Sequence, residues 1–195
     1  MPLFSQVNGA LHSGDILQIE GPNGCGKTTL LRMLAGSLSP TEGEICWQQQ
    51  PTARCRQQFL RDVLFIGHQP AIKLELSPLE NLRYWRSMTG CQPRLADNRA
   101  LAQMKLVGYE DAPCYSLSAG QLRRAALARL LVSDARIWLL DEPFTAIDKQ
   151  GVDELSGLIA DHASQGGVVV LSTHQPLALS GLKRLALTAP EELLS

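Results

Sequence analysis

The chain has 195 residues, of which 45% are apolar and 19% are charged, so one domain with a packed core is expected. Eighteen basic and 19 acidic side chains leave a formal net charge of −1, which offers no basic excess to a nucleic acid. Apolar runs such as residues 168–171 are too short to cross a bilayer, the N-terminus does not resemble a secretory signal, and the five cysteines form no C-x-x-C pair. Composition therefore excludes a membrane-spanning chain, a secreted disulfide scaffold and a fibrous protein.

Short strands are predicted wherever apolar or β-rich runs lie between turn residues. These runs are residues 15–20, 44–47, 63–67, 136–140, 168–172 and 184–188. The first run follows a Ser13-Gly14 turn and is predicted to pair with the stretch before it as a hairpin. The last run is predicted to be an edge strand. The runs at 136–140 and 168–172 are apolar on both faces, which is typical of buried parallel strands.

Helices are predicted between these strands, at residues 28–35, 121–132 and 152–164. Further helical residues between about 78 and 112 are interrupted by Gly90, Pro93 and Gly108, and they indicate a small helical insert rather than a separate domain. Alternation of helices with buried apolar strands predicts an α/β fold with a mostly parallel sheet.

A glycine-rich loop lies between the first predicted strand and helix and matches the pattern G-x-x-x-x-G-K-[ST]. Glycines let the backbone curl so that its N–H groups point at an anion, and the helix N-terminus adds partial positive charge. Lys27 is expected to reach the β- and γ-phosphates of a nucleotide, and Thr28 to offer its hydroxyl to Mg²⁺. The candidate phosphate-binding residues are Gly21, Pro22, Asn23, Gly24, Cys25, Gly26, Lys27, Thr28 and Thr29. The loop alone does not choose between a kinase, a GTPase and an ATPase.

Two carboxylates end the apolar run at residues 137–140. Asp141 suits coordination of Mg²⁺, and Glu142 suits a base or orienter for an attacking water. An acidic helix cap would explain the pair equally well in isolation. The phosphate loop elsewhere in the chain favours the catalytic interpretation.

Residues 117–121 read Leu-Ser-Ala-Gly-Gln and resemble the LSGGQ signature of ABC-type ATPases, with Ala119 at the third position. Residue chemistry alone indicates a serine-capped helix start. The resemblance implies an ABC-type P-loop NTPase that binds ATP and Mg²⁺ and hydrolyses ATP. It also implies one ABC ATPase domain over residues 1–195, with a mostly parallel sheet core, a small antiparallel β part and a short helical subdomain inserted at about residues 75–132.

Further positions resemble the remaining family motifs. Gln69 is similar to the Q-loop glutamine, which touches Mg²⁺ and the attacking water, and His174 is similar to the switch histidine, which contacts the γ-phosphate. Asp148 lies in a segment that resembles the D-loop. Taken singly, Gln69 and His174 also have the ordinary interpretation of a solvated or core side chain. The resemblance implies catalytic residues Glu142, His174 and Gln69, and magnesium ligands Thr28, Gln69 and Asp141.

Two copies pack head to tail in this family, so each ATP lies between the phosphate loop of one copy and the signature of the other. The resemblance therefore implies a homodimer in which a second ATPase subunit supplies the signature. Those residues are Leu117, Ser118, Ala119, Gly120 and Gln121.

Within the family, residues 65–73, 139–148 and 166–177 are most similar to the ATP-binding subunits of haem export in cytochrome c maturation. This implies the integral membrane permease subunits of that haem complex as partners, and a peripheral place at the cytoplasmic face of the bacterial inner membrane. Residues 71–85 mix leucines with few charges and are expected to face the membrane partner, although a helix–core contact explains the leucines equally well. Two alternatives stay open: the ATPase of another small-molecule transporter, and a soluble ABC ATPase, which the single cassette and the near-neutral charge disfavour.

Two features depart from the family pattern. ABC ATPases usually carry an aromatic residue on an early strand that stacks on adenine, whereas Phe4 lies too close to Gly21 in sequence to favour that role. We therefore expect this strand to be missing from the small β part. Cys25 lies inside the phosphate loop, where it is either a small filler or a thiol whose modification slows the ATPase.

Overall fold

The computed structural model describes residues 3–187 of the chain. Its centre is a sheet in the order β4-β5-β6-β1-β7, in which each neighbouring pair is parallel. The strands are β1 (Ile16–Glu20), β4 (Val63–Ile66), β5 (Ile137–Asp141), β6 (Val168–Ser172) and β7 (Leu182–Ala186). This order confirms the predicted mostly parallel α/β fold.

The strand β1 lies between β6 and β7, with Ile16 beside Val169 on one edge and Leu182 on the other. The predicted hairpin is therefore wrong: residues 3–15 contain no strand, and both edges of β1 are already paired in parallel. The physical reason is burial, because Ile16 and Ile19 are 3% and 0% exposed and suit a central strand. The predicted edge strand is confirmed as β7, although Thr188 of that prediction lies outside the described residues.

A small antiparallel pair confirms the second part of the predicted fold. It joins β2 (Cys46–Trp47) to β3 (Gln50–Pro51), with Trp47 opposite Gln50. The short helix α2 (Arg56–Arg61) follows and leads into β4. Its buried Phe59 lies 6.2 Å from the ring of Trp47, which holds this pair against the helix.

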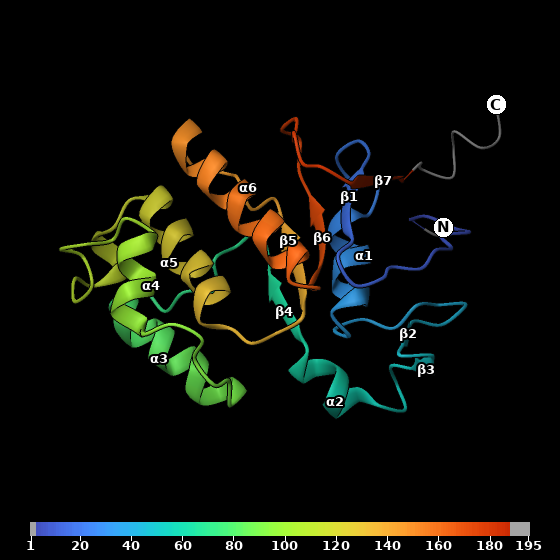
Figure 1. Cartoon of the computed structure of the whole chain (residues 1–195), viewed down its shortest axis with the longest axis horizontal. Helices are drawn as coiled ribbons and strands as arrows, with labels where there is room; N and C mark the ends of the chain where they lie inside the picture. Colours follow the sequence, from blue (N-terminus) through green and yellow to red (C-terminus); the bar gives the residue numbers. More distant parts are fainter. Residues whose placement is uncertain (1–2, 188–195) are drawn as a thin grey trace.

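Helices cover both faces of the sheet (Figure 1). On one face, α1 (Lys27–Leu34) packs Leu30 and Leu31 against Leu139 and Val170. On the other face, α5 (Ala119–Val132) and α6 (Lys149–Ser164) pack against the neighbouring strand residues. That cluster includes Leu127, Leu130, Leu155 and Ile159 from the helices and Trp138, Leu140, Val169 and Leu171 from the strands. The period of two along β5 and β6 thus supplies two buried faces.

The helices α3 (Pro78–Thr89), α4 (Asp97–Gln103) and α5 gather on the side of the molecule away from β2 and β3 (Figure 1). A 3₁₀ turn at Cys114–Ser116 leads into α5. Leu79 and Leu82 of α3 are buried against the other two helices, so a helix–core contact explains these two leucines. Leu74 is 46% exposed and stays available to a partner.

No helix between residues 3 and 187 has the length and the apolar character that crossing a bilayer requires.

Candidate functional site

The glycine-rich loop joins the end of β1 to the start of α1, and three of its residues adopt positive φ angles. These are Gly21, Gly24 and Gly26, at 146°, 85° and 104°. A Cβ at Gly21 would lie 2.6 Å from the carbonyl oxygen of Leu187, so a side chain does not fit there. The loop therefore wraps the N-terminus of α1, where unpaired backbone N–H groups favour an anion.

The side chain of Lys27 folds back over this loop. Its Nζ donates to the carbonyl oxygens of Gly21 and Pro22, at 2.8 Å and 3.2 Å. The residue is 8% exposed. A buried ammonium group needs such partners, because removing it from water without hydrogen bonds is costly. The ammonium is thus held against the glycine-rich loop by its own carbonyl oxygens.

Asp141 lies at the carboxyl end of β5, where two hydroxyl groups meet its side chain. Thr28 Oγ1 donates to Oδ2 at 2.8 Å, and Ser172 Oγ donates to Oδ1 at 2.7 Å. The residue is 2% exposed. These contacts join α1, β5 and β6 at one point and present hard oxygen atoms, the donor type that Mg²⁺ prefers.

Glu142 follows Asp141 in a left-handed conformation with φ of 49°. Its backbone N–H donates to the carbonyl oxygen of Ser172 at 3.1 Å. Within the described part of the chain, the buried Oε1 atom has no hydrogen-bond partner, and His174 Nε2 lies 3.5 Å away. A buried carboxylate oxygen that lacks a hydrogen bond is costly, and the imidazole of His174 is the neighbouring group placed to offset that cost.

A cavity of about 460 Å³ opens in front of these residues. Its walls come from the phosphate loop, the carboxyl ends of β4 and β5, the loop after β6 and the N-terminal segment. The lining residues are Leu3, Asn23, Gly24, Gly26, Lys27, Thr28, Thr29, His68, Asp141, Glu142, Thr145 and His174.

The structure thus brings together most residues that the sequence analysis assigned to phosphate, Mg²⁺ and catalysis. Gln69 is exposed and is absent from this lining as far as the described residues go, whereas its neighbour His68 belongs to the lining. Pro22 belongs to the glycine-rich loop, and its carbonyl oxygen accepts a hydrogen bond from Lys27. Cys25 is 3% exposed, which gives a reagent poor access to its thiol and favours the small filler among the two roles predicted for it.

The N-terminal segment lies against the phosphate loop, which sequence spacing did not anticipate. A Cβ at Gly26 would lie 2.6 Å from a ring carbon of Phe4 and 3.4 Å from Leu3. Ser172 was missed as well, although a serine as the last residue of a buried apolar strand is a recognisable signal for a polar group at the end of the sheet.

The signature residues occupy the start of α5. Ser118 Oγ accepts from the N–H of Gln121 at 3.3 Å, and Gln121 Oε1 accepts from the N–H of Ser118 at 2.9 Å. This reciprocal pair is a capping box. Ser118 and Ala119 are exposed, Leu117 is 9% exposed, and a Cβ at Gly120 would lie 2.7 Å from the carbonyl oxygen of Ala146.

Among the described residues that line the 460 Å³ cavity, none comes from the signature. Asp148 is separate from the cavity too: it caps α6 by accepting from the N–H of Gly151 at 3.2 Å, and it pairs with Arg124 of α5 at 2.5 Å. Within one chain, the signature therefore presents its capped serine outward rather than toward the chain's own phosphate loop.

Comparisons with known proteins agree with this geometry. Residues 4–145 match the family described as ABC transporter. The cytochrome c biogenesis ATP-binding export protein of Yersinia pestis bv. Antiqua (strain Nepal516) is 53% identical over 90% of this chain and 80% of its own length. The protein of the same name from Escherichia coli (strain K12) is 50% identical over 95% of this chain and 89% of its own.

A solved structure titled as the dimeric, post-hydrolysis state of the ATP-binding cassette MJ0796 with ADP and Pi is also similar. It is 27% identical and matches with a TM-score of 0.74 over 89% of this chain and 80% of that chain.

Proposed function

This chain belongs to the ABC transporter family, and from that premise we propose that it is the ATP-binding and ATP-hydrolysing subunit of a membrane complex that acts in cytochrome c biogenesis. One observation carries the enzymatic part of the proposal. A loop that can hold phosphate, a buried aspartate, a carboxylate with an unpaired oxygen and a histidine all meet at one cavity. The relatives' shared name carries the biological part.

Binding begins at the phosphate loop in this proposal. The curled backbone and the N-terminus of α1 favour the β- and γ-phosphates of ATP. Lys27 exchanges its contacts with Gly21 and Pro22 for the phosphate oxygens.

Mg²⁺ fits the oxygen donors that meet at Thr28 and Asp141, and Gln69 is proposed as a further contact because its neighbour His68 lines the same cavity. When bound, the ion neutralises charge on the β- and γ-phosphates.

Hydrolysis is assigned to Glu142 and His174. Glu142 orients a water and accepts its proton while the water oxygen bonds to the γ-phosphorus and the bond to the bridging oxygen of ADP breaks. Oε1, which accepts no hydrogen bond from residues 3–187, is available for that water. His174, 3.5 Å from Oε1, is placed to hydrogen-bond the departing phosphate, and it supports the carboxylate.

The outward-facing signature supports a site that two chains complete. Ser118 and Gly120 of one copy are proposed to contact the γ-phosphate held by the other copy, through a helix N-terminus that favours anions. Permease subunits of a haem complex at the cytoplasmic face of the inner membrane are the proposed membrane partners.

A glutamine variant of Glu142 tests the enzymatic proposal. In the purified full-length chain, Glu142→Gln is expected to bind Mg-ATP with wild-type affinity, to lose steady-state hydrolysis, and to accumulate dimers in analytical ultracentrifugation. The control Lys27→Ala is expected to lose ATP binding instead. Undiminished hydrolysis by Glu142→Gln would remove this residue from the catalytic role.

Complementation tests the biological proposal. A bacterium that lacks its own cytochrome c biogenesis ATP-binding export protein receives the gene for this chain, and covalent haem on c-type cytochromes is then stained. The wild-type chain is expected to restore the staining, and Glu142→Gln is not. Failure of a well-expressed, ATP-hydrolysing chain to restore haem staining would favour another transport substrate.

A further inference from the structure

Arg123 is a fully buried charge on α5, and the proposed mechanism does not use it. The residue is 3% exposed and lies in the second turn of the helix that begins at the signature. Burial lowers the pKa of its guanidinium, while the nearby carboxylates of Asp141 and Glu142 act in the opposite direction. A charge in such a place is tolerated when each of its donors finds an acceptor.

The five N–H groups of this guanidinium meet five backbone carbonyl oxygens. Nε donates to Pro143 at 3.3 Å, and Nη2 donates to Asp141 and Glu142 at 3.0 Å and 2.9 Å. Nη1 donates to Gly67 and His68 at 2.8 Å and 3.4 Å. One side chain thus holds two segments, the turn after β5 and the turn after β4.

Both segments carry proposed catalytic groups. The contacted carbonyls at residues 141–143 belong to Glu142 and its two neighbours, and Glu142 has a left-handed backbone that is unfavourable for a side-chain-bearing residue. Such a conformation persists when the surroundings fix it from several sides. The contacted carbonyls at residues 67 and 68 immediately precede Gln69. The positions of Glu142 and Gln69 therefore depend on the same guanidinium.

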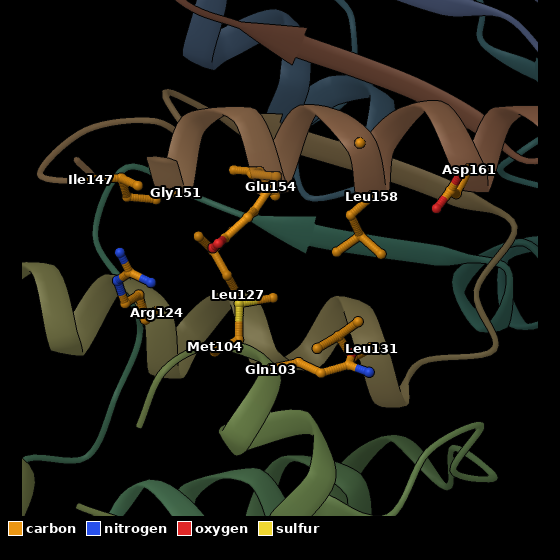
Figure 2. A pocket seen from close by; sticks show the side chains of 12 residues that line it. Gln103, Met104, Arg124, Leu127, Leu131, Ile147, Gly151, Glu154, Leu158 and Asp161 are labelled. Carbon is orange, nitrogen blue, oxygen red and sulfur yellow. The ribbon is translucent and has the colours of Figure 1, made fainter. Parts of the chain in front are cut away.

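A cavity of about 300 Å³ lies between α5 and α6, with Leu127, Leu131 and Leu158 facing it and Arg124 at one end (Figure 2). Beside this cavity, Leu127 and Leu130 of α5 share one apolar cluster with Leu155 and Ile159 of α6. The N-terminal half of α5 reaches the turns after β4 and β5 through Arg123, and its C-terminal half reaches the chain beyond Gln69 through Arg129, whose Nη2 donates to the carbonyl oxygen of Ala71 at 2.7 Å. Ser118, which we propose meets the other copy's ATP, begins the same helix.

We propose that Arg123 is a positioning residue that fixes the backbone of Glu142 and of the segment leading to Gln69 relative to the signature helix. This inference rests on the proposed function, because it assigns to Arg123 the placement of that function's catalytic groups. This role does not require Arg123 to contact ATP. Loss of Arg123 should therefore lower kcat and leave ATP binding nearly unchanged.

The test measures kcat, KM and ATP affinity of the full-length chain with Arg123→Gln and Arg123→Lys. Because misplacement by about 1 Å costs roughly a hundredfold in rate, kcat of Arg123→Gln is expected to fall about a hundredfold while KM stays within about twofold. Lysine keeps the charge but has three donors, so Arg123→Lys is expected to be intermediate. If Arg123→Gln does not fold, Arg123→Lys tests the positioning role by the same criterion, a lowered kcat with a nearly unchanged KM.

Two control experiments distinguish a positioning role of Arg123 from a general loss of stability. Arg86→Gln removes a side chain that pairs with Asp97 inside the helical insert, at 2.6 Å, and it reports what lost stability alone does to kcat. In the Glu142→Gln background, Arg123→Gln is expected to lower the residual single-turnover rate little further, since it acts through Glu142.

Three results would each overturn the positioning role. The first is an equal effect of Arg123→Gln in the wild-type and Glu142→Gln backgrounds, and the second is a wild-type kcat in Arg123→Gln. The third is a loss of kcat that Arg86→Gln reproduces at the same melting temperature. Full hydrolysis by Glu142→Gln alone would instead overturn the proposed function.

Discussion

His162 is a buried histidine whose charge state is tied to folding. Its ring stacks on Trp138 with centroids 3.7 Å apart and an interplanar angle of 5°. Nε2 lies 3.1 Å from the carbonyl oxygen of Arg136, and because a carbonyl only accepts, Nε2 carries a proton. Burial lowers the pKa of the ring, while the contact with Arg136 raises it and the charge of Arg94 lowers it. The folded chain therefore favours neutral His162.

The pH dependence of stability follows from that direction. In the unfolded chain His162 takes up a proton near pH 6.5, whereas in the folded chain it does so at lower pH. The contribution of His162 to the free energy of unfolding is therefore complete above about pH 6.5 and declines as the pH falls below it. The decline is at most about 1.4 kcal/mol per pH unit. Melting temperatures between pH 7.5 and 5.5 check this, and His162→Gln is expected to lose less stability over that range than the wild-type chain.

Gly157→Ala in the same helix α6 supplies the control, because it changes no titratable group and its added Cβ meets no atom of residues 3–187 within 4 Å. Gly157→Ala is expected to keep the wild-type pH profile of stability. A His162→Gln profile that runs parallel to wild type would show that His162 does not produce the pH dependence.

At the scale of elements, the start of α5 packs so closely on the segment before α6 that no side chain fits between them. A methyl group at Gly120 would lie 2.7 Å from the carbonyl oxygen of Ala146. Arg124 of α5 also pairs with Asp148, which caps α6. The signature and the D-loop-like segment are therefore packed directly against each other.

Gly120→Ala is expected to separate these two segments and to reduce ATP turnover, while the phosphate loop still binds ATP. The matched control is Gly157→Ala in α6, where a Cβ meets no atom of residues 3–187 within 4 Å. Alanine is favoured over glycine inside a helix by about 1 kcal/mol, so this control should raise the melting temperature slightly and keep wild-type turnover. ATPase and nucleotide-binding assays on both variants check the prediction, and wild-type turnover in Gly120→Ala would contradict it.

At the scale of the whole molecule, the proposed ATP site is divided between two surfaces that a single chain keeps apart. The cavity at the phosphate loop and the exposed Ser118 are both present in each copy. A two-fold dimer with identical patches on both subunits would therefore form two equivalent ATP sites.

Hydrolysis per chain is consequently expected to rise steeply with protein concentration. Mixing two variants tests directly whether the site is shared between chains. Lys27→Ala has a defective phosphate loop but an intact signature, and Ser118→Arg has a defective signature but an intact phosphate loop. Each variant alone is expected to be inactive, whereas a mixture forms one intact site per heterodimer and recovers ATPase activity. A mixture that stays inactive, although dimers form, would contradict a site shared in this way.

Local patterns predicted much of this molecule. The phosphate loop, the carboxylates after β5 and the capping of α5 depend on residues close together in the chain, so their placement followed from short motifs. The parallel sheet followed from apolar strands alternating with helices. The strands that neighbour β1 could not be predicted in this way, because β6 and β7 come from the far end of the sequence and no local signal specifies that pairing.

Side-chain partners were less predictable for the same reason. Ser172 reaches Asp141 from a neighbouring strand, and Arg123 reaches two turns from a helix. In the sequence, Arg123 is one of three arginines interspersed among apolar residues between 121 and 132, and its five acceptors are backbone atoms that carry no residue signature. The exposed position of Gln69 was equally invisible, because a motif gives an order of residues and not the path of a turn.

The folded-back ammonium of Lys27 has a consequence for nucleotide exchange. Two carbonyl oxygens already hold this ammonium group, so under the proposed function a triphosphate would replace existing hydrogen bonds rather than meet a bare cation. The net free energy of its association would be smaller for that reason. The carbonyl oxygens of Gly21 and Pro22 would then compete with the phosphate oxygens for the same lysine.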